Sequence, residues 1–212
     1  IADPRERPAD AKQAADTAHL QFADSGSEFL AVIRLWRAYR QMHEELSQSQ
    51  LRKWCERNFL SYLRMREWRE LHRQLLITGG ELQWPVPQGP VIEARLEAAA
   101  QDTKAAARHY QQIHRAVLAG LPTQIGHKND KGLYDGPRQR RFAIFPASPL
   151  AGQLPNWCLV GNLLDTQKVW GMMAAKLDPE WVIEECAHLL GRKHFDPHWS
   201  RSQGRVVGYC QI

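Results

Sequence analysis

The sequence predicts an α+β chain of two modules: an all-α helical bundle over residues 1–120, then a small five-stranded β-barrel with one inserted helix over residues 121–212. Two observations carry this prediction. Before Gly120 apolar residues recur with the 3.6-residue period of helices, whereas after it short apolar runs alternate with Gly and Pro. With 43% hydrophobic residues and eight Trp, the 212-residue chain has enough apolar surface to bury a core.

The first helices are predicted from caps and apolar periodicity. A short helix-compatible run extends from Asp10 to Phe22, and Ser25 or Ser27 can cap the next helix. Ser47, with Gln50 three residues later, has the spacing of a capping box for a third helix. The apolar face of the helix after Ser27 is expected to comprise Phe29, Val32, Ile33, Trp36 and Tyr39.

The stretch from Leu51 to Leu76 repeats cations, aromatic residues and aliphatic residues at helical spacing. Its apolar phase slips between Asn58 and Ser61, which predicts two helices with a bend, the second capped by Ser61. Gly79 and Gly80 are expected to end that second helix. Its predicted apolar stripe comprises Leu60, Leu63, Trp68, Leu71 and Leu75.

The other faces of this stretch carry seven cations and three carboxylates, a local charge of +4. Such a surface would attract polyanions. It would equally suit a solvated helix stabilised by ion pairs, such as Glu70 with Arg66 and Arg73. Charge alone leaves both interpretations open.

Proline interrupts the chain after these helices. Residues 83–90, QWPVPQGP, cannot form regular helix or a central strand, so we interpret them as a connector. A long helix, or two, is expected from Val91 to about Ala119, where the helical module ends.

After Gly120 the chain is expected to form strands with one helix among them. Asp178 as N-cap, Pro179 at the first helical position and Gly191 after the end predict that helix. About five strands with one inserted helix suit a small Greek-key barrel. The predicted strands cover 121–127, 142–145, 157–164, 168–177 and 205–210, with Phe142, Trp157 and Trp181 assigned to the core.

The sequence lacks the motifs of an ATPase. Its nearest approach to a phosphate-binding loop runs from Gly120 to Asn129, with one residue too many between the glycines and His127 where a Lys is needed. No Asp-Glu-x-His tetrad is present. We therefore expect no catalytic residue and no cofactor in this chain, and we predict that it is inactive as an enzyme by itself.

The cysteines and the hydropathy of the chain indicate which cellular compartment, metal sites and membrane contacts to expect. Cys55, Cys158, Cys186 and Cys210 form no close pairs, which suits a reducing cytoplasm. Cys186 and His188 stand two residues apart and would not face each other on a helix, so no metal site is expected. No apolar run approaches the roughly 20 residues that span a bilayer, so no membrane partner is expected.

Long stretches of the chain match a known order of modules. SEFLAVIRLWRAY at 27–39 and LRKWCERNFLSYLRMREWRELHRQL at 51–75 resemble the ratchet helical domain of bacterial DEAH-box RNA helicases of the HrpA type. IHRAVLAGLPTQIGHK at 113–128, RFAIFPASPL at 141–150 and LDPEWVIEECAHLL at 177–190 resemble that family's next module, an oligonucleotide-binding (OB) fold. Residues 1–22 resemble the segment that enters the ratchet domain, so the resemblance covers nearly the whole chain.

The resemblance implies a C-terminal accessory region of an ATP-dependent RNA helicase. The parent protein would hydrolyse ATP with Mg²⁺ in two RecA-like motor domains that precede this chain, and the start at Ile1 fits a piece of a longer protein. The chain would grip single-stranded RNA during 3′-to-5′ translocation in the cytoplasm. The alternative is a protein-interaction module that docks on the motor and regulates it, which exposed Trp and Leu in one patch would favour.

The residues expected to contact RNA are chosen for charge and ring chemistry, because cations bind phosphates and aromatic rings stack on bases. Residues 101–212 carry 14 Lys+Arg against 9 Asp+Glu, whereas residues 1–100 carry 14 of each. For any single residue the alternative is a solvated turn, or the core in the case of Trp170. The candidates are Lys128, Lys131, Arg138, Arg140, Arg141, Lys168 and Trp170, with Arg64 and Arg66 on the earlier helices.

Overall fold

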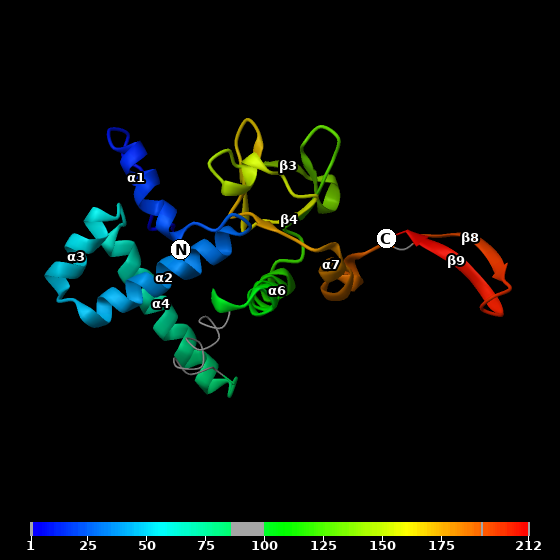
Figure 1. Cartoon of the computed structure of the whole chain (residues 1–212), viewed down its shortest axis with the longest axis horizontal. Coiled ribbons are helices and arrows are strands. Elements are labelled where there is room, and N and C mark those ends of the chain that lie inside the picture. The colour runs from blue at the N-terminus through cyan, green and yellow to red at the C-terminus, as the bar shows by residue number, and fades with distance from the viewer. Residues whose placement is uncertain (1, 86–99, 192, 212) are drawn as a thin grey trace. The chain divides into compact units, whose positions relative to one another are not determined.

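The computed structural model describes residues 2–85, 100–191 and 193–211 (Figure 1). The chain divides into two compact units. The helical unit comprises Ile1–Tyr110 with Ala147–Gly152, and the sheet unit comprises Gln111–Pro146 with Gln153–Ile212. The expected connector beyond Pro85 and the beginning of the helix expected from residue 91 lie outside the described residues.

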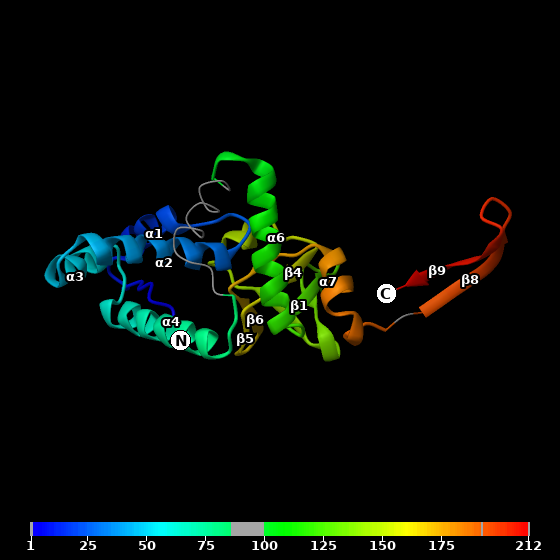
Figure 2. The same cartoon turned by 90° about the horizontal axis from the view of Figure 1, so that it is seen from below.

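The helical unit begins with α1 (Lys12–His19) and a 3-10 turn at Leu20–Phe22. Three longer helices follow, α2 (Glu28–Glu45), α3 (Gln48–Arg57) and α4 (Tyr62–Glu81). Figure 2 shows α2 and α4 side by side, with α3 joining them at one end. None of the described helices is long and apolar enough to cross a membrane.

The predicted caps of α2 and α3 are confirmed. Ser27 Oγ accepts a hydrogen bond from Leu30 N at 3.2 Å. Ser47 and Gln50 form the reciprocal capping box, in which each side chain bonds the other residue's backbone. Ser61 is the N-cap residue of α4, as predicted, but its side chain makes no cap hydrogen bond in the described structure.

The predicted bend between α3 and α4 is a Schellman motif. Asn58 ends α3, and Phe59 takes a left-handed conformation with φ 51°. Phe59 N donates to Glu56 O at 3.1 Å and Leu60 N donates to Cys55 O at 2.9 Å, the two bonds that define the motif. The motif stops α3 and redirects the chain into α4, which explains the slip in apolar phase.

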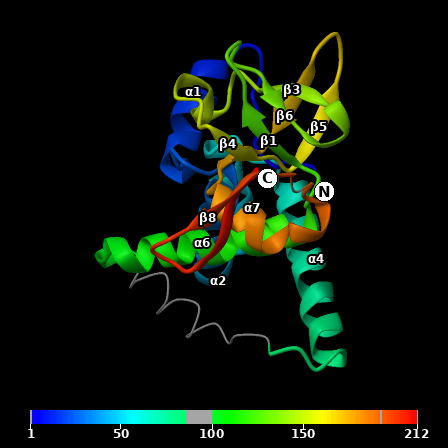
Figure 3. The same ribbon diagram turned by 90° about the vertical axis from the view of Figure 1, so that its right-hand side faces the viewer.

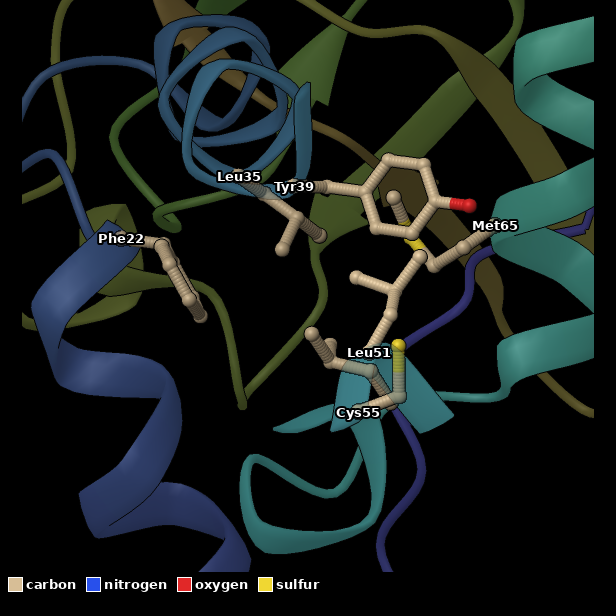
Figure 4. Close-up of a cluster of buried hydrophobic side chains, with 7 residues drawn as sticks. Phe22, Leu35, Tyr39, Leu51, Cys55 and Met65 are labelled. Carbon is tan, nitrogen blue, oxygen red and sulfur yellow. The ribbon is translucent and has the colours of Figure 1, made fainter. Parts of the chain in front are cut away.

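The core of the helical unit lies between α2, α3 and α4. Its buried side chains are shown in Figure 4: Phe22, Leu35, Tyr39, Leu51, Cys55 and Met65, together with Leu60. Burial raises the pKa of the Cys55 thiol to about 11, so this thiol stays protonated at neutral pH. Trp36, Trp54 and Trp68 are partly buried against the cluster.

The predicted apolar stripe of α4 is wrong in part. Leu63 and Leu75 are 63% and 61% exposed, whereas Met65 is 0% exposed. The face that packs inward carries Met65, partly buried Trp68, His72 against the Trp36 ring, and buried Gly79, a heptad-like spacing of mixed residue types. The leucine spacing alone therefore predicts the wrong face of α4 to be buried. The predicted stop at Gly79–Gly80 is also wrong, because α4 continues to Glu81.

The sheet unit is built on one sheet of seven strands within the described residues, in the order β5-β6-β3-β2-β1-β4-β7 (Figure 3). Neighbours pair antiparallel except β3 and β6, which are parallel. The strands are β1 (Ile125–Lys128), β2 (Tyr134–Asp135), β3 (Arg141–Ile144), β4 (Trp157–Leu159), β5 (Asn162–Asp165), β6 (Val169–Met172) and β7 (Ala175–Lys176).

The α+β class is confirmed, but the sheet is not a closed five-stranded barrel. Its strand order is open, with β5 and β7 at the ends. The predicted strand 157–164 divides into β4 and β5 around Val160–Gly161. The predicted strand 168–177 divides into β6 and β7 at Met173, whose φ is 54°. A left-handed residue without the signal of a Gly is difficult to foresee.

Two helices belong to this part of the chain. α6 (Thr103–Gly120) passes from the helical unit into the sheet unit at residue 110, and α7 (Pro179–Glu185) follows β7. The predicted N-cap of α7 is confirmed, since Asp178 accepts from Glu180 N at 3.0 Å. Arg115 of α6 donates to Glu185 at 2.7 Å and pairs with Glu184 at 2.8 Å.

The last predicted strand does not join this sheet. Residues 205–210 lie in β9 (Arg205–Gln211), which pairs with β8 (Lys193–Ser200) as a separate two-stranded sheet. Phe195 and Tyr209 stack on one face with ring centroids 5.6 Å apart, and both rings are exposed. Of the aromatic residues predicted to lie in the core, Phe142 is buried, but Trp157 and Trp181 are half-buried.

Packing in the sheet unit centres on the ring of Phe142. This ring stacks on Tyr134 with centroids 5.5 Å apart. A Cβ placed on Gly126 would lie 2.6 Å from Phe142 Cζ, and one on Gly171 would lie 2.9 Å from Phe142 Cδ2. Glycines at these positions of β1 and β6 therefore make room for the ring on β3.

Replacing Gly126→Ala is expected to lower the free energy of unfolding by about 1–3 kcal/mol, because the added methyl group overpacks Phe142 and Tyr134. Urea unfolding followed by Trp fluorescence measures this change. Gly120→Ala is the control, since a Cβ there meets nothing within 4 Å at the end of α6. Its unfolding free energy should be unchanged or slightly raised. Equal destabilisation by both substitutions would contradict the packing described for Phe142.

Candidate nucleic-acid interface

Three of the predicted cations lie together at the turn between β2 and β3. Arg138 and Gln139 both have positive φ, 57° and 58°, and Gly136 N donates to Arg140 O at 2.7 Å to close the turn. This backbone path leaves Arg138, Arg140 and Arg141 exposed. The turn therefore presents three guanidinium groups to solvent.

One of these guanidinium groups is paired. Arg141 Nε lies 2.6 Å from Asp135 Oδ1, and Asn129 Nδ2 donates to the other oxygen of Asp135 at 3.0 Å. These two hydrogen bonds hold the pKa of the Asp135 carboxyl below its usual value, and the bond from Arg141 has the larger effect. In the described structure Arg138 and Arg140 make no ion pair, so their charges remain available to an anion.

Lys168 lies at the same edge of the sheet as these arginines. β3 and β6 are parallel and pair Ala143 with Trp170, so the first residues of both strands lie at one edge. Lys168 immediately precedes β6 and is exposed, and Arg141 begins β3. We call Arg138, Arg140, Arg141 and Lys168 the basic edge.

Trp170 is half-buried on β6 and contributes to packing. Its ring meets Phe145 edge-on with centroids 5.9 Å apart. It pairs across the ladder with Leu164 of β5, which is 45% exposed. Trp170 follows Lys168 by two residues, and its indole is partly packed in the core and partly exposed to solvent.

Lys128 and Lys131 do not join the basic edge. Lys128 ends β1 and Lys131 lies in the turn between β1 and β2. This turn is at the other end of the short β2 ladder from the β2–β3 turn. Lys128 Nζ donates to Leu154 O at 3.0 Å, and this side chain is half-buried. Lys131 is exposed, and its backbone N–H donates to Asn129 Oδ1 at 3.1 Å. The predicted group of five cations is thus two groups.

The two predicted arginines of α4 have different surroundings. Arg64 Nη1 donates to Asp3 O at 2.8 Å, so it ties the N-terminal segment to α4. Arg66 lines a pocket between α2, α3 and α4, beside Arg69.

Two groups of residues were missed by the sequence prediction. Arg69 stands three residues after Arg66 and lines the same pocket. Residues three apart lie on the same face of a helix, so the sequence spacing could have indicated this. The hairpin β8–β9 carries exposed Phe195, Trp199 and Tyr209, of which Trp199 is 62% exposed. Its signal was the alternation in 205–210, whose partner strand at 193–200 went unrecognised.

Comparison with known proteins finds a fold-family match in the sheet unit. Residues 113–189 match the family model described as "Oligonucleotide/oligosaccharide-binding (OB)-fold". This range includes all seven strands of the sheet and α7. The expected OB-fold is thereby confirmed.

The chain is also similar to named helicases over nearly its whole length. It is 40% identical over 208 residues to the ATP-dependent RNA helicase HrpA of Escherichia coli, and equally to the ATP-dependent RNA helicase HrpA homolog of Haemophilus influenzae. Each match covers 98% of this chain but 15% of the relative, so the chain spans about 15% of the length of these curated relatives. The predicted resemblance to the HrpA type is confirmed.

Arg141→Gln is expected to raise the pKa of Asp135 toward the usual Asp value of about 3.9, because it removes the strongest partner of the carboxylate. A carboxyl-carbon NMR titration measures this pKa. The folded-state pKa lies below the unfolded one, so the ion pair contributes to stability above the unfolded pKa, and this contribution is lost as pH falls through the folded pKa. Arg138→Gln is the control and should leave the pKa of Asp135 where it is. An unchanged Asp135 titration in Arg141→Gln would contradict this assignment.

Proposed function

Because the chain is homologous over 98% of its length to HrpA-type ATP-dependent RNA helicases and contains an OB-fold at residues 113–189, we propose that it is an accessory nucleic-acid-binding region of such a helicase. In this proposal it grips single-stranded RNA during 3′-to-5′ translocation. ATP and Mg²⁺ act in DEAH-box, RecA-like motor domains of the same protein, outside this chain. The sequence has no G-x-x-x-x-G-K-[ST] phosphate-binding loop, so the proposal places ATP binding in those motor domains.

The observation that carries the proposal is the basic edge of the OB sheet. Four exposed cations lie at one edge because β3 and β6 are parallel: Arg138 and Arg140 in the β2–β3 turn, Arg141 at the start of β3, and Lys168 just before β6. A row of cations on an OB sheet suits the phosphate backbone of a single strand. Trp170 and Leu164 lie next to this edge and offer an apolar surface to a base.

Binding of this kind depends on contacts to RNA phosphates more than on contacts to bases. Arg and Lys side chains recognise phosphate charge, which is the same along any sequence. RNA binding should therefore tolerate changes of sequence and weaken as salt rises. Both properties suit a region that must hold many different nucleotides in turn as the strand advances.

The proposed place of action is the cytoplasm. Cys55, Cys158 and Cys186 are free and buried in the described structure. Unpaired thiols are typical of proteins in a reducing compartment.

A second candidate function, docking on the motor, is favoured by the surface of α4. Leu71, Leu75 and Leu82 recur at helical spacing and are exposed, and Trp84 after the helix end is 65% exposed. Exposed apolar residues gathered on one helix are typical of a protein interface. We propose that this face of the helical unit contacts the RecA-like domains and so couples the region to the motor.

Replacing Arg140→Gln together with Lys168→Gln is expected to weaken binding of a labelled single-stranded RNA about fivefold, because two phosphate contacts are lost. Fluorescence anisotropy across a salt series measures it. The wild-type affinity should fall steeply with salt, and the slope of log K against log salt should become shallower by about 1.4 in the double variant.

The matched control is Lys12→Gln with Lys104→Gln, which removes two exposed cations from the helical unit and leaves the basic edge intact. Its RNA affinity and salt slope should stay close to those of the wild type. Equal losses in the two double variants would mean that net charge alone, and not the basic edge, sets the affinity.

A further inference from the structure

A pocket of about 330 Å³ opens on the helical unit between α2, α3 and α4. It is lined by His43 from α2, Gln48 from α3, and Tyr62, Arg66 and Arg69 from α4, with two leucines as apolar walls. Three helices held together by the core of Figure 4 thus converge on one hollow.

The pocket is electrostatically positive. Among the described residues that line it, two carry guanidinium groups and none carries a carboxylate. A third guanidinium, that of Arg52, lies 5.1 Å from the centre of the Tyr62 ring. Two carboxylates of α2 and α4 bind other arginines: Glu70 pairs with Arg73 at 2.7 Å and Glu44 with Arg40 at 3.3 Å. The charge of Arg66 and Arg69 is therefore not cancelled by these carboxylates.

Arg69 is held in position at the pocket by His43. A guanidinium has no acceptor, so Arg69 Nη1 donates to His43 Nε2. A fixed guanidinium loses less conformational freedom when it binds an anion, and its remaining N–H groups form a planar fork that fits phosphate oxygens.

A buried hydroxyl lies next to these arginines. Tyr39 is fully buried, its ring is 6.1 Å from that of His43, and its hydroxyl has no hydrogen-bond partner in the described structure. Figure 4 shows this hydroxyl directed toward α4 beside Met65. Burial raises the pKa of Tyr39, while Arg69 and Arg66 oppose that effect, so the hydroxyl stays a donor within reach of their charge. Tyr39 is not among the residues that line the pocket, so its hydroxyl adds no direct contact to an anion bound there.

We propose that this pocket binds a tetrahedral oxyanion through Arg66 and Arg69, and that in the parent helicase the oxyanion is a phosphate group of the RNA backbone. The site is separate from the basic edge, and its assignment to RNA rests on the proposed function. It gives the helical unit its own point of grip on the strand.

The test is NMR of the arginine Nε–H signals of the whole chain during titration with inorganic phosphate, against sodium chloride at equal ionic strength. Signals assigned to Arg66 and Arg69, by their loss in Arg66→Gln and Arg69→Gln, should shift and saturate with phosphate. In Arg66→Gln the Arg69 shift should fall at least threefold, and Arg66→Lys should restore only part of it, because Lys lacks the planar fork. Circular dichroism confirms that each variant is folded.

The matched control is Arg73→Gln on the same helix, since Arg73 is exposed and paired with Glu70. It should leave the shifts of Arg66 and Arg69 unchanged, and in the wild type the Arg73 signal should not respond to phosphate. Equal responses of all arginines, or no response at the pocket, would overturn the proposal.

A second titration with an unphosphorylated RNA oligonucleotide identifies the source of the phosphate. Shifts of the same pocket signals support the RNA backbone as ligand. A response to phosphate but not to RNA would overturn that assignment and leave a site for a free phosphate. Because Arg140→Gln with Lys168→Gln should keep the phosphate shifts, failure of the basic edge and failure of the pocket are distinguishable.

Discussion

The packing of the Phe142 ring against two glycines is the constraint on which the basic edge depends. Gly126 on β1 and Gly171 on β6 leave the space that this ring fills, so β3 can lie parallel to β6 while β1 remains close. The parallel pairing then brings the β2–β3 turn and the residue before β6 to one edge. A core interaction therefore determines where surface charge collects.

In the helical unit, too, local backbone structure and core packing determine where the cations lie. The Schellman motif at Phe59 ends α3 and sets the direction of α4. Met65, Trp68 and His72 then face inward. Arg66 follows Met65 and Arg69 follows Trp68 in sequence, and both arginines line the pocket beside His43. Glu44 of α2 and Glu70 of α4 pair with other arginines, so these two carboxylates do not neutralise Arg66 and Arg69.

Local features of this fold were predictable from sequence, and long-range ones were not. The caps of α2, α3 and α7 involve neighbours along the chain: Ser47 and Asp178 were correctly placed, and Ser27 was one of the two candidates for α2. The break at Met173 has no sequence signal, and the pairing of β3 with β6 joins residues far apart. For the same reason the sequence indicated which cations belong to the sheet unit, but not that Lys168 joins Arg138 while Lys131 does not. Whether these residues bind RNA remains a prediction.

The central claim, that RNA runs along the basic edge, is tested most directly by photo-crosslinking. A single-stranded RNA carrying 4-thiouridine would be irradiated with the chain, and the crosslinked peptides would be identified by mass spectrometry. The account predicts crosslinks in residues 136–141 and 166–170, on the two turns that meet at this edge. Crosslinks confined to the β1–β2 turn or to the β8–β9 hairpin would contradict it.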